Sequence, residues 1–95
     1  MMKMLVTVTI TKGFARWVEM TKSLQPMAEE NGMRMIWAGT NPDETQVYVG
    51  MELQNAEQMK TFGEREDVVK ARAEAGAIVE STTVISPIGQ DYIPA

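Results

Sequence analysis

The sequence predicts an α+β fold in which helices cover one face of a four-stranded antiparallel sheet. Three observations support this prediction: strand-like segments at both ends of the chain, helix-like segments inside them, and a hairpin pattern in the middle. The 95 residues, 44% of them apolar, provide for one core and therefore for one domain, residues 1–95. We expect residues 88–95 to form a C-terminal tail.

The first segment, residues 2–10, alternates between two faces and is therefore expected to be a strand. One face is wholly apolar and comprises Met2, Met4, Val6, Val8 and Ile10. The other face is mixed and comprises Lys3, Leu5, Thr7 and Thr9. Because the second face is far from hydrophilic, we expect it to be at least partly covered as well.

Residues 14–30 follow the periodicity of an amphipathic helix, with apolar side chains on one side and charged ones on the other. Pro26 falls on the polar side, where we expect it to kink the helix outward. Asn31 and Gly32 then supply a helix stop. This helix is expected to lie on a core.

The middle of the chain predicts a β-hairpin, with strands at residues 33–39 and 45–53 and turn formers at residues 41–44. Strict alternation places Trp37 on the more apolar side of the first strand, so we expect it to face the helices. The same rule places Tyr48 on the opposite side of the sheet.

A second helical region begins at Asn55, and Gln58 stands where a capping box would reach back to the amide of Asn55. Gly63 weakens this region, which predicts one broken helix or two short ones. The fourth strand, from residue 77 to about 85, is rich in β-branched residues, and Pro87 is expected to end its ladder.

With right-handed crossovers, the order β-α-β-β-α-β gives a ferredoxin-like fold with both helical regions on one face of the sheet. The opposite face, which carries Leu5, Thr7 and Tyr48, stays open in a single chain. Covering ~400 Å² of apolar surface contributes on the order of 10 kcal/mol before the costs of association. We therefore expect two copies to pack sheet to sheet as a homodimeric α+β barrel with a cavity.

The composition excludes several kinds of site and partner. Without Cys or His, the chain has no disulfide, no thiolate and no imidazole base. Its nine basic and 13 acidic side chains are scattered, with a formal charge of −4, so no basic cluster suits nucleic acid. No membrane span, signal peptide, phosphate loop or metal-ligand pattern is present, so we expect a cytoplasmic protein without metal, cofactor or membrane partner.

Three short segments carry a family resemblance: Phe14-Ala15-Arg16-Trp17, Glu66-Asp67, and the run from Ala75 to Thr82. With the element order, they make nearly the whole chain similar to the dimeric α+β barrel group that includes the antibiotic-biosynthesis monooxygenase domains, and especially to its small members. The resemblance implies a homodimer that holds an apolar small molecule between sheet and helices or between sheets. Some such relatives are cofactor-free oxygenases, but those that oxidise aromatic substrates or degrade haem usually use Asn, Trp and His, and His is missing here.

Seven residues are candidates for a ligand site. Arg34 carries a planar guanidinium that suits a carboxylate, so we expect it to anchor the polar end of a ligand; a surface arginine is the alternative. Glu52 shares the face of Tyr48 and could serve as a base beside an apolar cavity. For Trp37 the alternative is a structural role in the core. The expected walls are Leu5, Thr7, Ile36, Trp37 and Tyr48.

Nine methionines suit either plastic core packing or a binding surface for variable apolar shapes. The sequence therefore predicts a homodimeric barrel that binds an apolar, fatty-acid-like molecule with a carboxylate. One alternative is a cofactor-independent monooxygenase or isomerase that uses Tyr48 and Glu52. Another is a ligand-free assembly or interaction module, so the sequence leaves open whether the protein is an enzyme.

Overall fold

The computed structural model describes residues 2–94, so Met1 of the expected domain and Ala95 of the expected tail lie outside the described residues. Seven elements follow one another along the chain: β1 (Met2–Ile10), α1 (Phe14–Glu30), β2 (Arg34–Thr40), β3 (Gln46–Leu53), α2 (Ala56–Gly63), α3 (Glu66–Glu74) and β4 (Ala77–Ile88). The predicted α+β, ferredoxin-like fold is confirmed. The second helical region forms two short helices, one of the two outcomes expected from Gly63.

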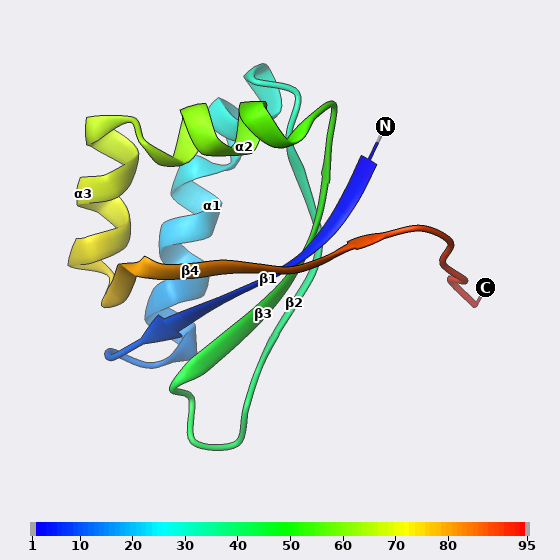
Figure 1. Cartoon of the computed structure of the whole chain (residues 1–95). Helices are drawn as coiled ribbons and strands as arrows, with labels where there is room; N and C mark the ends of the chain where they lie inside the picture. Colours follow the sequence, from blue (N-terminus) through cyan, green and yellow to red (C-terminus); the bar gives the residue numbers. More distant parts are fainter. Residues whose placement is uncertain (1, 95) are drawn as a thin grey trace.

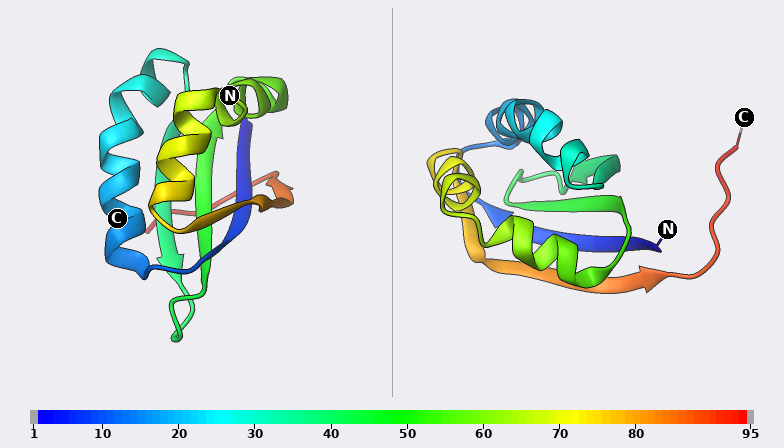
Figure 2. Two further views of the ribbon diagram at one scale, coloured as in Figure 1. Left: turned by 90° about the vertical axis from the view of Figure 1, so that its left-hand side faces the viewer. Right: turned by 90° about the horizontal axis from the view of Figure 1, so that it is seen from above.

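The four strands form one antiparallel sheet in the order β2-β3-β1-β4. All three helices lie on one face of this sheet (Figure 1), and the left view of Figure 2 shows α1 and α3 in front of the strands. Among residues 2–94, no helix or strand covers the other face, which we call the outer face. No helix in this part of the chain is long and apolar enough to cross a membrane.

The predicted alternation of the first strand is confirmed, because its apolar positions from Met4 to Ile10 are buried toward the helices. These positions divide between two core clusters. The first cluster comprises Val8, Ile10, Trp17, Met20, Val47, Val49, Ala75 and Ala77. The second cluster comprises Met4, Val6, Met33, Leu53, Phe62 and Val68. Leu24 and Met51 pack against both clusters and so connect them.

The expected orientation of Trp37 is wrong. The pairing of β2 with β3 shifts by one residue at Ile36, so that Met35 lies opposite Met51 but Trp37 lies opposite Gly50. A bulge of this kind reverses the alternation for all later residues of the strand. Trp37 therefore lies on the outer face, with 58% of its surface exposed.

Two further local expectations also need correction. Strand β4 does not end before Pro87, which lies opposite Met4 in the ladder. Because β4 is an edge strand, a residue without an amide N–H is tolerated there. At the start of α2, the Asn55 side chain accepts a hydrogen bond from the backbone amide of Gln58. The Gln58 side chain does not reach back to the amide of Asn55 as expected, but accepts from the amide of Gln54 at 3.0 Å.

Helix α1 continues through Pro26, which is exposed as predicted. The chain beyond β4 leaves the body of the molecule as an extended segment (Figure 2). An ion pair between the Lys3 Nζ and an Asp91 carboxylate oxygen, 2.9 Å apart, connects this segment to β1. Tyr92 and Ile93, farther along it, are largely exposed.

Candidate ligand-binding cavity

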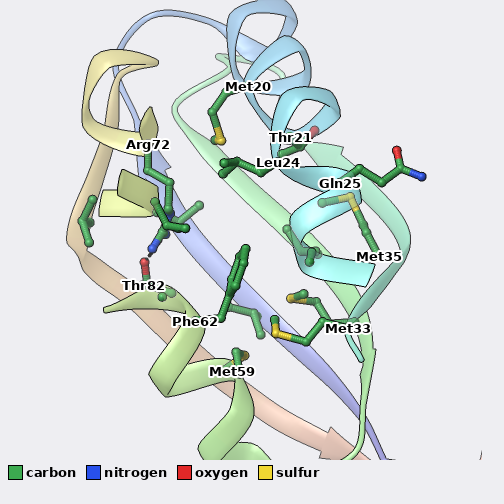
Figure 3. A pocket seen from close by; sticks show the side chains of 18 of the residues that line it. Met20, Thr21, Leu24, Gln25, Met33, Met35, Met59, Phe62, Arg72 and Thr82 are labelled. Atoms are coloured by element: carbon green, nitrogen blue, oxygen red, sulfur yellow. Dashed lines mark hydrogen bonds between the residues drawn. The ribbon is translucent and has the colours of Figure 1, made fainter. Parts of the chain in front are cut away.

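A cavity of about 570 Å³ lies between the helices and the sheet. Its walls come from both core clusters: Val8, Trp17 and Met20 belong to the first, and Met33 and Phe62 to the second. Figure 3 shows Met20, Met33 and Phe62 pointing toward one space from the helices and strands. The cavity therefore lies between the two core clusters, which do not pack into one continuous core.

Methionine contributes as many residues to the lining of this cavity as valine does, five each. Five of the nine methionines of the chain take part: Met20, Met33, Met35, Met51 and Met59. An unbranched, polarizable thioether adapts its shape to neighbouring groups more easily than a branched side chain does. The methionines of this chain therefore line the cavity as well as pack in the core.

Apart from Thr21, whose hydroxyl donates to the Val18 carbonyl within α1, the polar side chains around the cavity are of two kinds. The first kind is exposed to solvent and lies at the rim: Gln25, Glu29, Arg34, Lys60 and Glu64. The second kind comprises Arg72 on α3 and Thr82 on the edge strand β4, which are both half-buried. The Arg72 Nη2 donates a hydrogen bond to the Thr82 Oγ1 at 2.5 Å and so connects the two elements. Burial lowers the pKa of the Arg72 guanidinium, because desolvation disfavours its charged form.

Arg72 reaches the cavity because α3 presents it on the same face as Val68, four residues earlier and fully buried. Thr82 reaches the cavity because the ladder between β1 and β4 is irregular: Thr7 lies opposite Thr83, but Thr9 lies opposite Ile78. The four-residue spacing between Val68 and Arg72 could have indicated from the sequence that Arg72 lies on the buried side of its helix. Arg72 was not among the candidate site residues predicted from the sequence.

The seven predicted site residues fall mostly outside this cavity, and Arg34 alone among them contributes to its lining. The Arg34 Nη2 also lies 3.3 Å from the Glu52 Oε1, because the two residues stand opposite each other on β2 and β3. The structure therefore brings the expected anchor and the expected base together as an ion pair. Ile36 lies at the bulge and is exposed on its edge of the sheet.

The remaining candidates lie on the outer face, where Leu5, Thr7, Trp37 and Tyr48 follow the strand register. The Thr7 hydroxyl donates to the Val47 carbonyl at 2.9 Å and accepts from the Gln46 side chain at 2.6 Å. Its hydrogen-bonding capacity is thus largely used within the sheet. The outer face holds a separate group of candidates, and any role of these residues in ligand binding stays a prediction.

Within residues 2–94, no group of three or more carboxylates converges closely enough to hold a metal ion. The side chains available to a ligand in the cavity are therefore apolar walls, exposed rim charges and the Arg72–Thr82 pair. This arrangement can enclose an apolar body and contact one polar end.

Comparison with known proteins gives likeness in fold only. No family model and no curated protein matches the sequence. The solved structure of protein YjcS is 14% identical, with a TM-score of 0.58, and the match covers 98% of this chain and 100% of that one. A candidate antibiotic biosynthesis monooxygenase from Deinococcus radiodurans is 11% identical, with a TM-score of 0.50 and complete coverage of both chains. The predicted resemblance to the α+β barrel group is therefore confirmed at the level of the fold.

Proposed function

We propose that this protein binds an apolar small molecule in the cavity between the helices and the sheet. The observation that carries the proposal is the cavity itself, whose volume of about 570 Å³ falls within the usual range of ligand pockets, roughly 300–1,000 Å³. Its walls are mostly apolar, and its polar groups are the exposed side chains at the rim, Thr21 and the Arg72–Thr82 pair. A space of this size and lining favours an elongated or ring-shaped hydrocarbon over a polar metabolite.

Filling the cavity tests this proposal. Ala28 lines the cavity on α1, whereas Ala15 is exposed on the same helix, so Ala28→Phe and Ala15→Phe add the same side chain in different places. N-phenyl-1-naphthylamine, a neutral apolar dye, should bind wild-type protein and the Ala15→Phe variant with enhanced fluorescence. We expect Ala28→Phe to weaken dye binding at least tenfold.

Circular dichroism and thermal unfolding must show that the variants are folded. A wild-type protein that fails to bind the dye, and that carries no co-purified ligand in native mass spectrometry, would contradict the proposal. Equal dye affinity in folded Ala28→Phe and Ala15→Phe variants would place the binding site elsewhere.

We further propose that a second copy of the chain covers the outer face, giving a homodimer in the cytoplasm. The outer face leaves Trp37, Tyr48 and Ile78 substantially exposed, which is unfavourable for a sheet surface in water. The fold likeness to the α+β barrel group supports the same arrangement. In such a dimer, the predicted outer-face candidates would line the space between the two sheets.

A cofactor-independent monooxygenase or isomerase is the second candidate, supported by the fold likeness to the Deinococcus radiodurans structure. Tyr48 and Glu52 would supply the polar groups, although Glu52 is paired with Arg34. Oxygen uptake on a panel of phenolic and polycyclic substrates tests this candidate, and turnover should fall at least tenfold in Tyr48→Phe or Glu52→Gln. The third possibility, a ligand-free assembly module, is disfavoured because it requires an interior filled by side chains.

A further inference from the structure

Arg72 is the feature of the cavity that an apolar ligand alone leaves unexplained. It is half-buried, and the described structure gives its guanidinium one protein acceptor, the Thr82 hydroxyl. The ion pairs within residues 2–94 involve other cations, so no carboxylate in this part of the chain neutralises Arg72. A positive charge thus faces an apolar space without a counter-charge.

Such an arrangement is unfavourable for the protein by itself. Burying a charge without a partner costs free energy, and a guanidinium has more N–H donors than one hydroxyl can satisfy. The acidic members of the lining, Glu29 and Glu64, are exposed at the rim rather than paired with Arg72. The missing partner must therefore accept several hydrogen bonds, carry negative charge and fit inside an apolar cavity.

A carboxylate meets these requirements best. Its two oxygens match the planar fork of a guanidinium, and a single negative charge balances a single positive one. The Thr82 hydroxyl can turn its proton toward a carboxylate oxygen while its own oxygen still accepts from Arg72. A hydrocarbon chain attached to this carboxylate would then lie against the methionine side chains of the cavity.

We propose that the ligand of the cavity is an amphipathic carboxylate whose head group is held by Arg72 and Thr82. This inference rests on the proposed function, since it names the polar end of the molecule that the cavity takes. It replaces Arg34 as the anchor, because Arg34 already has a carboxylate partner in Glu52. Arg72 is thereby a specificity-determining residue that distinguishes an acid from an alcohol of the same length.

The test compares ligands that differ only in the head group: dodecanoate, dodecanol and dodecyltrimethylammonium, each measured by displacement of N-phenyl-1-naphthylamine. We expect wild-type protein to bind dodecanoate at least tenfold more tightly than dodecanol, and the cation most weakly. Arg72→Met should reduce dodecanoate affinity to that of dodecanol while leaving dodecanol affinity unchanged. The matched control is Arg16→Met, because Arg16 is an exposed helical arginine that also donates one hydrogen bond, to the Glu74 carbonyl at 3.1 Å.

A second measurement does not depend on a variant. Dodecanoate labelled with ¹³C at the carboxyl carbon should show, when bound to wild-type protein, a carboxyl pKa below that of the free acid, because a nearby guanidinium favours the ionised form. Equal wild-type affinity for dodecanoate and dodecanol, or an unshifted carboxyl pKa, would overturn the assignment of Arg72 but keep the cavity as a binding site. Failure of all three ligands to bind would instead refute the proposed function on which the assignment rests.

Discussion

Trp37 packs its indole over the backbone of Gly39 on the outer face of the sheet. A Cβ atom placed on Gly39 would lie only 2.7 Å from the indole Cζ2, closer than carbon atoms approach without moving. The two residues share a face because they are two positions apart after the bulge at Ile36. The absence of a side chain at Gly39 therefore determines where the largest exposed side chain of the sheet lies.

Substitution of Gly39 by Ala should displace the indole of Trp37 without unfolding the protein. The clash involves the far end of a side chain that is free to turn, so we expect the free energy of unfolding to change by less than about 1 kcal/mol. In protein labelled with 5-fluorotryptophan, the ¹⁹F resonance of Trp37 should shift and that of buried Trp17 should not.

The control is Gly50→Ala, because Gly50 faces Trp37 across the strands but its nearest non-neighbouring atom, the Trp37 carbonyl oxygen, would be 3.9 Å from the new Cβ. This variant should leave the Trp37 resonance close to its wild-type position. An unchanged Trp37 resonance in Gly39→Ala would show that the indole does not rest on Gly39.

The proposed dimer predicts that a charge at Trp37 weakens self-association. We expect wild-type protein to sediment as a dimer at micromolar concentration, and Trp37→Glu to raise the dissociation constant at least tenfold, about 1.4 kcal/mol. The reason is that a carboxylate buried between two sheets would lack a partner. Ala15→Glu, which adds the same charge on an exposed helical position, should sediment like wild type. A well-folded wild-type monomer at this concentration contradicts the dimer and the space between its sheets.

The order of elements could be predicted from the sequence because most of it depends on local patterns. Alternation in β1 places Val6 and Val8 on the covered face, and the structure buries both. The reversal at Trp37 could not be predicted in this way, since a bulge inserts one residue without a distinctive sequence pattern. A rule of strict alternation then assigns every later residue of β2 to the wrong face.

The sequence could predict an adaptable apolar cavity, but it could not predict the position of the cavity between the helices and the sheet. A methionine-rich chain indicated an adaptable apolar site, and the cavity has methionine walls. Its position depends on the gap between two core clusters, which arises from how three helices pack and not from any one segment. The sequence indicated Arg34 as a candidate because it is a cation at the start of a predicted strand. The position of Arg72 beside the cavity depends on the packing of α3 against β4, which no local pattern indicates.

Removal of the Asn55 side chain should destabilise the protein through the start of α2. The Asn55 Oδ1 accepts from the Gln58 amide at 2.9 Å, which satisfies one of the free N–H groups of the first helical turn. We expect Asn55→Ala to lower the free energy of unfolding by about 1 kcal/mol, measured with urea. Asn55→Ser keeps a capping oxygen and should lose much less. Equal losses in the two variants would show that packing rather than capping explains the effect.

Replacement of Arg72 by Met should make the unliganded protein at least as stable as wild type. Exchanging a half-buried, unneutralised cation for an apolar side chain of similar length relieves the desolvation that lowers the pKa of Arg72, and we expect a gain of about 1 kcal/mol. The variant leaves the Thr82 hydroxyl without its donor, so Arg72→Met combined with Thr82→Val should gain slightly more. Urea unfolding of ligand-free protein measures both.

The sign of this change separates a binding residue from a structural one. If Arg72 is kept for a ligand, then dodecanoate should stabilise wild-type protein against urea more than it stabilises the Arg72→Met variant, because stabilisation by a ligand increases with its affinity for the folded state. The exposed control Arg16→Met should be stabilised by dodecanoate as wild type is. A ligand-free Arg72→Met variant that loses more than about 1 kcal/mol would mean that Arg72 supports the packing of α3 on β4, because its hydrogen bond to Thr82 would then outweigh the cost of burying its charge.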